Sequence, residues 1–162
     1  MQTLTDIYIY PIKSVKAISQ PAAIVEEKGL SFDRRYMLID LDGKFITGRT
    51  HPKLTQVDVQ FSQKKLHLNA PNMSALTIDP ELFSSGRLTS QIWADKVNVQ
   101  HCHVDYDNWF SEYLQSPCQL VFFAKNSKRY IKNRETQVAF ADGYPLLLVN
   151  QASVDLLNSK LN

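Results

Sequence analysis

The chain has 162 residues, of which 44% are hydrophobic and 21% charged, a size and composition typical of one globular domain or of one domain with the start of another. This composition excludes an intrinsically disordered chain. The formal net charge of +2 does not indicate a nucleic-acid-binding protein, because such proteins concentrate basic residues on one face.

The first part of the chain alternates apolar and polar residues with a period of two. Ile7 and Ile9 alternate with polar neighbours and predict a first strand. The segments 36–41 and 44–49 flank Asp42-Gly43, which is a strong short signal for a hairpin turn.

Two further hairpins are expected before residue 104. Residues 57–61 and 66–68 alternate across a short connection, and 87–93 and 97–103 flank the predicted turn 94–96. So many short strands predict a mainly β fold, a β-barrel or sandwich, with one or two short helices and an α+β character overall.

The pattern then changes. Asp105 or Asp107 is expected to cap a short helix that ends before Pro117. A buried strand is predicted at 119–124, followed by a polar and basic loop at 125–134.

The last segment reads as a strand that leads into a helix. Residues 144–149 are predicted to form the strand, and Asn150 is expected to cap a helix with Val154, Leu157 and Leu161 on one face. A strand and helix that open a new unit suggest an excised part of a longer protein.

The lack of a recognisable secretory signal and the small number of cysteines favour a cytoplasmic protein. The N-terminus has no basic segment before an apolar stretch, and no apolar run reaches the roughly 18 residues of a membrane span. Cys102 and Cys118 form no CxxC motif. One disulfide stays open as an alternative, but a reducing compartment is the better expectation.

The motif YPIKS at residues 10–14 is the first candidate site. Pro11 cannot donate to a strand ladder, so Lys13 and Ser14 are expected in the connection after the first strand. An ammonium and a hydroxyl side by side suit a phosphate, and a solvated turn is the alternative.

The motif FDRRYMLID at residues 32–40 is the second. Arg34 and Arg35 must point in opposite directions at the entry of a strand, and the inner guanidinium needs an anion or an internal carboxylate such as Asp33 or Asp40.

Two other clusters carry weaker signals. In a strand, His101 and His103 share a face that Cys102 does not, so a metal site there is not expected. The basic loop is either a solvated face or a surface that attracts anions. Its basic side chains are Lys125, Lys128, Arg129, Lys132 and Arg134.

The stretches YPIKSVKA, GLSFDRRYMLID with DGKFITGRTHPKL, and VAFADGYPLLLVNQASVDLLNSKL together resemble the MOSC family, in particular the bacterial relatives of the mitochondrial amidoxime reducing component. The resemblance implies an N-terminal β-barrel domain at 1–124, a basic connecting loop at 125–140 and a truncated start of the MOSC domain at 141–162. It also implies a protein that binds the molybdenum cofactor and reduces N-hydroxylated compounds such as hydroxylaminopurines and amidoximes.

On this resemblance, Lys13, Ser14 and Arg35 hold the phosphate and polar edge of the molybdopterin. A further contact is implied for Gly143 and Tyr144, where some relatives carry small hydroxyl residues, so only backbone contacts or a different polar group from Tyr144 carry over. The implied partners are an N-hydroxylated small molecule and an electron-donating reductase or ferredoxin-like domain with a 2Fe-2S cluster.

The family's molybdenum-binding cysteine lies further downstream, and neither Cys102 nor Cys118 sits in a matching motif. The chain by itself is therefore expected to be catalytically incompetent. Two other functions stay open, namely a noncatalytic module that docks a redox partner and a part of a molybdenum-cofactor sulfur-transfer protein.

Overall fold

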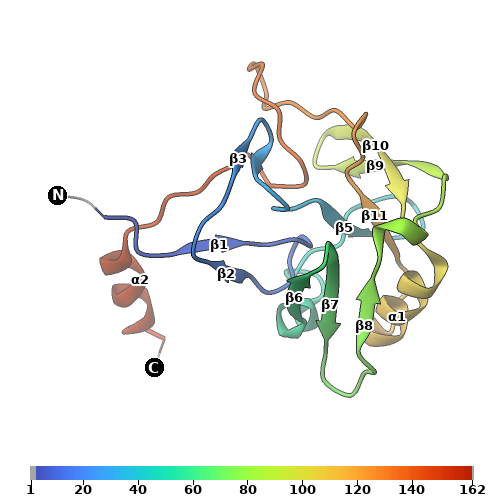
Figure 1. Cartoon of the computed structure of the whole chain (residues 1–162), viewed down its shortest axis with the longest axis horizontal. Helices are drawn as coiled ribbons and strands as arrows, with labels where there is room; N and C mark the ends of the chain where they lie inside the picture. The colour runs from blue at the N-terminus through green and yellow to red at the C-terminus, as the bar shows by residue number, and fades with distance from the viewer. Residues whose placement is uncertain (1–2, 162) are drawn as a thin grey trace.

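The computed structural model describes residues 3–161, which form short strands, two α-helices and two 3-10 helices (Figure 1). The strands are β1 (Ile7–Ile9), β2 (Ile18–Gln20), β3 (Val25–Glu26), β4 (Gly29–Leu30), β5 (Tyr36–Ile39), β6 (Asp58–Ser62), β7 (Lys65–Asn69), β8 (Leu76–Ile78), β9 (Arg87–Ile92), β10 (Asp95–His101) and β11 (Gln119–Phe122). The helices are η1 (Pro52–Gln56), η2 (Pro80–Leu82), α1 (Val104–Leu114) and α2 (Gln151–Asn158).

The strands pair in four antiparallel sheets, and these pairings do not close into one continuous ladder among the described residues. The largest sheet has the order β5-β11-β10-β9, and a second has the order β6-β7-β8. The pairs β1-β2 and β3-β4 complete the set. The mainly β fold with two short helices confirms the predicted class.

The turns follow the predicted turn residues, but 44–49 forms no strand and pairs only through isolated bridges such as that of Phe45 with Ile39. Gly43 has φ +79° and a Cβ there would lie 2.9 Å from the carbonyl oxygen of Thr89, so only glycine suits this turn. Gln63 and Lys64 adopt positive φ between β6 and β7. The turn between β9 and β10 is Trp93-Ala94, one residue earlier than predicted, because Asp95 already pairs with Ile92.

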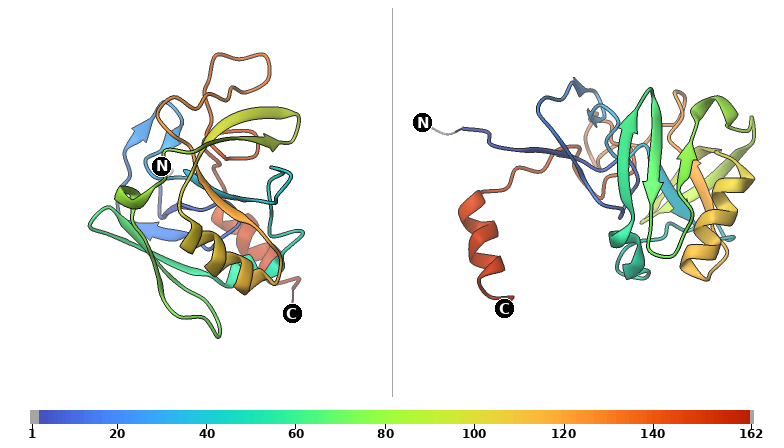
Figure 2. Two further views of the ribbon diagram at one scale, coloured as in Figure 1. Left: turned by 90° about the vertical axis from the view of Figure 1, so that its right-hand side faces the viewer. Right: turned by 60° about the horizontal axis from the view of Figure 1, so that its bottom comes forward.

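Two apolar cores lie on the two sides of the main sheet. One includes Leu38, Phe110 and Leu120 and joins the sheets to α1, whereas the other includes Met37 and Val121. This division follows from the period of two, since Met37 and Leu38 point to opposite faces. Figure 2 shows α1 beside β8 and β11.

Helix α1 begins at a residue that the sequence did not indicate. Its N-cap is His103, whose Nδ1 accepts from the backbone N–H of Asp105 at 3.2 Å. The prediction of Asp105 or Asp107 as the cap is wrong, because the extended backbone ends at His103 and both aspartates fall in the first helical turn. Gln115 ends the helix with φ +54°.

The strand predicted at 144–149 does not form. This segment is irregular and mostly exposed, and none of the sheets among the described residues pairs with it. The predicted helix does form as α2, with Asn150 as the N-cap, whose side chain accepts from Ala152 N–H at 2.8 Å. It ends at Asn158, so Leu161 lies outside it. Its apolar side chains are largely exposed, and α2 stands apart from the sheets at the end of an extended segment (Figures 1 and 2).

None of the helices within residues 3–161 combines the length and the apolar character that crossing a bilayer requires. Cys102 and Cys118 are both buried and carry free thiols, so the disulfide alternative between them is not realised.

Candidate functional site

The connection after β1 is bound to the start of β5. Lys13 N–H donates to the carbonyl oxygen of Tyr36 at 2.9 Å, and Tyr36 N–H donates to that of Pro11 at 3.0 Å. Ser14 has φ +69° and turns the chain away from this contact. The two motifs YPIKS and FDRRY, more than twenty residues apart, therefore lie on neighbouring backbone segments.

The Lys13 ammonium is buried and donates to two acceptors of the chain. The residue is 6% exposed, and Nζ donates to the carbonyl oxygen of Phe140 at 2.9 Å and to Oδ1 of Asp142 at 2.7 Å. Burial lowers the pKa of Lys13, while the bond to Asp142 opposes that shift. The Phe45 ring centroid lies 5.6 Å from Nζ.

Asp142 is the exposed partner, with 62% of its side chain accessible. Partial burial acts to raise the pKa of its carboxyl group, but the hydrogen bond and charge of Lys13, with smaller contributions from Trp93 and Arg49, outweigh that effect and lower the pKa. In this pair the lysine side chain lies inside and the carboxylate lies at the surface.

A hollow of about 260 Å³ opens beside this ion pair, several times the roughly 30 Å³ that a water molecule occupies in the liquid. A Cβ at Gly48 would lie 3.3 Å from the Thr55 methyl group, so a side chain there would narrow the space. The lining offers two cations and three hydroxyl groups against one carboxylate. It consists of Lys13, Ser14, Thr47, Gly48, Arg49, Thr55 and Asp142.

Arg35 does not line this hollow. The residue is 9% exposed, and its Nη2 donates to Oε2 of Glu26 on β3 at 2.6 Å. Its Nη1 is buried without a hydrogen-bond partner, which costs free energy unless a ligand supplies an acceptor. Arg34, by contrast, pairs with Asp33 at 2.6 Å and lies over the Tyr10 ring.

Gly143 and Tyr144 are exposed and follow Asp142 directly. Tyr144 is 63% exposed, and the Arg134 guanidinium lies 6.0 Å from its ring centroid. The next residue, Pro145, packs against Gly29 of β4, whose hairpin partner β3 carries the carboxylate that binds Arg35. This segment thus runs from the Lys13 hollow to the hairpin that holds Arg35.

Arg129 is the functional candidate that sequence reasoning missed. It lies in the basic loop, where a solvated side chain or an anion-attracting surface was expected, yet the residue is 6% exposed. Its guanidinium binds Asp95 and three carbonyl oxygens. Its neighbours Lys128 and Tyr130 are exposed. Side chains in this loop therefore alternate between exposed and buried, which its basic composition does not reveal.

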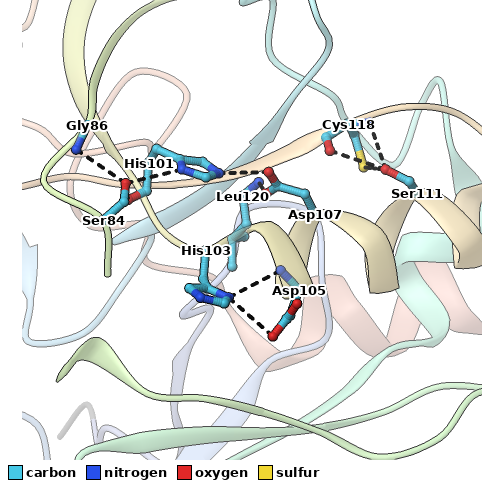
Figure 3. Close-up of polar contacts among 9 residues, drawn as sticks. All are labelled: Ser84, Gly86, His101, His103, Asp105, Asp107, Ser111, Cys118 and Leu120. Carbon is cyan, nitrogen blue, oxygen red and sulfur yellow. Dashed lines mark hydrogen bonds and ion pairs between the residues drawn. The ribbon is translucent and has the colours of Figure 1, made fainter. Parts of the chain in front are cut away.

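The two histidines have separate structural roles (Figure 3). His101 Nε2 lies 2.7 Å from Oδ2 of Asp107, and its Nδ1 lies 3.2 Å from the Ser84 hydroxyl. His103 has left the strand and caps α1, so the expectation that both share one strand face is wrong. Within residues 3–161 no three metal-binding side chains come together.

Comparisons with known proteins agree with the resemblance seen in the sequence. The model of the family described as MOSC N-terminal beta barrel domain matches residues 1–117. The chain is 31% identical to mitochondrial amidoxime reducing component 2 of Bos taurus, over 98% of this chain and 51% of that protein. It is 28% identical to molybdenum cofactor sulfurase of Danio rerio, over 96% of this chain and 19% of that protein.

The chain spans about half the length of the amidoxime reducing components that it matches. A solution structure of a Bordetella bronchiseptica protein is similar over 64% of this chain and 88% of that chain, with 21% identity and a TM-score of 0.49.

Proposed function

Because the chain belongs to the MOSC N-terminal beta barrel domain family, we propose that it is the cofactor-clamping N-terminal part of a molybdenum-cofactor-dependent oxidoreductase. The observation that carries the proposal is the hollow in which Lys13 and Ser14 meet, with Arg49 as a second cation. Relatives named as amidoxime reducing components support the same assignment.

The residues present fit a phosphate-bearing group. The hollow offers an ammonium, a guanidinium and hydroxyl groups, which are the donors that phosphate oxygens accept from. The buried Nη1 of Arg35 needs an acceptor that the described chain does not supply. Lys13 and Ser14 would bind the phosphate of molybdopterin, Arg35 would contact its polar edge, and Gly143 and Tyr144 would border it.

When bound, the cofactor would supply the metal centre for a two-electron reduction. In the proposed reaction an N-hydroxylated compound loses its N–O bond, the oxygen leaves as water, and two electrons and two protons are consumed. This chain would hold the anion. The electrons would come from a reductase or a ferredoxin-like domain with a 2Fe-2S cluster, which also belongs to the proposal.

The test uses the longest protein product that contains this chain and measures its bound molybdopterin after purification. Lys13→Ala is expected to lower the cofactor content at least about tenfold, since a charge-assisted contact to phosphate is lost, and Arg35→Ala is expected to lower it as well. Lys16→Ala is the matched control, because Lys16 is an exposed lysine paired with Asp58. Wild-type content in both Lys13→Ala and Arg35→Ala would overturn the proposal.

A second candidate is a part of a molybdenum-cofactor sulfur-transfer protein. The similarity to the Danio rerio sulfurase over 96% of this chain favours it. It predicts the same dependence of cofactor binding on Lys13, so reduction of an amidoxime by the long product decides between the two.

A third candidate, a noncatalytic docking module, predicts a salt-sensitive complex with a reductase that survives Lys13→Ala but not charge reversal at exposed Lys128. A cytoplasmic location and the absence of nucleic-acid and membrane partners stay predictions, whereas the amidoxime reducing components that the chain matches are named as mitochondrial.

A further inference from the structure

The four residues Ala139 to Asp142 are held by two buried cations. Arg129 donates through Nη1 to the carbonyl oxygens of Ala139, at 3.0 Å, and Ala141, at 2.5 Å, and through Nη2 to that of Asp142 at 3.1 Å. Lys13 binds the remaining carbonyl, that of Phe140, at 2.9 Å. The peptide groups of this segment are therefore fixed from two sides.

Arg129 is itself anchored. Its Nε donates to Oδ2 of Asp95, the first residue of β10, at 2.8 Å. The segment it holds is also tied to the turn before β5, because Phe140 N–H donates to the carbonyl oxygen of Arg34 at 3.1 Å. A planar guanidinium reaches these separate acceptors at once, whereas a lysine ammonium cannot.

This arrangement brings the carboxylate of Asp142 to Lys13. The side chain contributes the one carboxylate in the lining of the hollow, and 62% of it is exposed. An anion that enters the hollow finds the Lys13 charge already neutralised. Asp142 can rotate into water at little desolvation cost, because most of its surface is solvated already.

We propose that Asp142 is a built-in counter-ion that competes with a phosphate-bearing ligand for Lys13, and that Arg129 is the positioning residue that holds Asp142 in place. This inference rests on the proposed function of the hollow. The ligand class is a phosphate monoester or diphosphate, and the hollow exchanges an internal carboxylate for an external anion.

The first test titrates inorganic phosphate or pyrophosphate into the 162-residue chain at constant ionic strength. Backbone amide shifts of Ser14 and Gly48 report binding. Asp142→Asn is expected to tighten binding about threefold to tenfold, the range set by a partly exposed pair and a charge-assisted hydrogen bond. Asp155→Asn, an exposed carboxylate in α2, is the matched control and is expected to leave the affinity unchanged.

The second test separates positioning from a merely structural role. Arg129→Lys keeps the charge but loses the fork, so it is expected to release Asp142 and tighten phosphate binding in part. In the Asp142→Asn background the same change is expected to have no further effect on affinity. An equal effect in both backgrounds would overturn the role of Arg129. Lys128→Gln removes the exposed charge next to Arg129 and is expected to leave the phosphate affinity unchanged.

A measurement on the wild-type chain covers the case in which Arg129→Lys does not fold. The side-chain carboxyl carbon of Asp142 is followed by NMR during the phosphate titration, and its shift is expected to move in step with the Ser14 amide. A carboxyl shift that stays constant while phosphate binds at Ser14 would overturn the exchange of anions.

Lys13→Gln distinguishes a failure of the proposed function from a failure of the counter-ion inference. If phosphate binding in the chain does not depend on Lys13, the proposed function of the hollow is wrong. If binding depends on Lys13 but Asp142→Asn matches the wild type, the hollow stands and the counter-ion inference alone is wrong. If phosphate binds the wild type and all of these variants with the same affinity, it is an adventitious ion only, and both the proposed function and the counter-ion inference are wrong.

Discussion

Lys13 and Asp142 lie 129 positions apart in the sequence and form an ion pair of 2.7 Å in which the two partners have very different surroundings. The ammonium side chain is 7% exposed, whereas the carboxylate side chain is 62% exposed. Desolvation therefore falls mainly on the lysine, and the pKa of Lys13 is lowered even though a carboxylate touches it.

This asymmetry predicts how stability depends on pH. The unfolded chain binds the Lys13 proton more tightly than the folded chain, so between the lowered pKa of Lys13 and 10.5 its titration makes folding more favourable as pH rises. We expect Lys13→Met to lose this contribution and to cost about 1–2 kcal/mol at pH 7, because the Phe140 carbonyl loses its donor. Urea unfolding of both proteins from pH 7 to 10 measures the difference.

The control for this experiment is Lys16→Met, which removes a lysine with a 47% exposed side chain and is expected to leave the pH profile parallel to the wild type. A gap between the wild type and Lys13→Met that shrinks as pH rises would contradict the prediction, since the lowered pKa requires it to widen.

Local signals predicted most of the fold. The turn at Gly43, the connection between β6 and β7, and the cap at Asn150 each depend on residues within a few positions, and each was found as expected. The prediction of a strand at 144–149 is wrong because it depended on distant residues. Apolar residues form a strand only where another strand supplies hydrogen-bond partners.

The site was predicted only in part, for the same physical reason. YPIKS indicated that Lys13 and Ser14 share a turn, and the structure places both in one hollow. The partners Asp142, Glu26 and the buried Arg129 are set by contacts between distant segments, and no spacing rule connects them. A basic loop looks the same in sequence whether one arginine is buried or all are solvated.

Asp107 is predicted to be the main polar link between α1 and the sheet. Its Oδ1 accepts from Leu120 N–H at 2.8 Å, and its Oδ2 lies 2.7 Å from His101 Nε2 (Figure 3). Asp107→Asn presents an N–H group to one of these partners, so we expect the free energy of unfolding to fall by about 1–3 kcal/mol. Chemical denaturation measures it, with Asp105→Asn as the control.

Asp105 lies in the same first turn but its side chain is 74% exposed, so its change is expected to cost less than about 0.5 kcal/mol. Equal losses in the two variants would show that the helix terminus, and not the contacts of Asp107, carries the effect.

The two thiols are predicted to be inert in the folded chain. Burial raises the pKa of Cys118 to about 11 and raises that of Cys102 well above its usual value, and the thiolate is the reactive form. We expect neither thiol to react promptly with a disulfide reagent at pH 8, and both to react in denaturant. Asp155→Cys adds an exposed thiol as the positive control, and rapid native reaction of two thiols without it would refute the burial of Cys102 and Cys118.

The core that joins α1 to the sheets is predicted to dominate stability. Phe110 is fully buried at 0% exposure and belongs to the cluster that contains Leu38 and Leu120, so Phe110→Ala removes many contacts and leaves a cavity. The expected loss is about 3–5 kcal/mol, which corresponds to a melting temperature lower by roughly 6 to 20 °C for a chain of this size.

Leu147→Ala is the matched apolar truncation outside the core. Leu147 is 86% exposed in the irregular segment before α2, so its removal is expected to change stability by less than about 0.5 kcal/mol. Thermal unfolding of the two variants beside the wild type measures both changes. A large loss in Leu147→Ala would mean that the segment before α2 packs against the rest of the chain, and a small loss in Phe110→Ala would mean that α1 does not hold the sheets together.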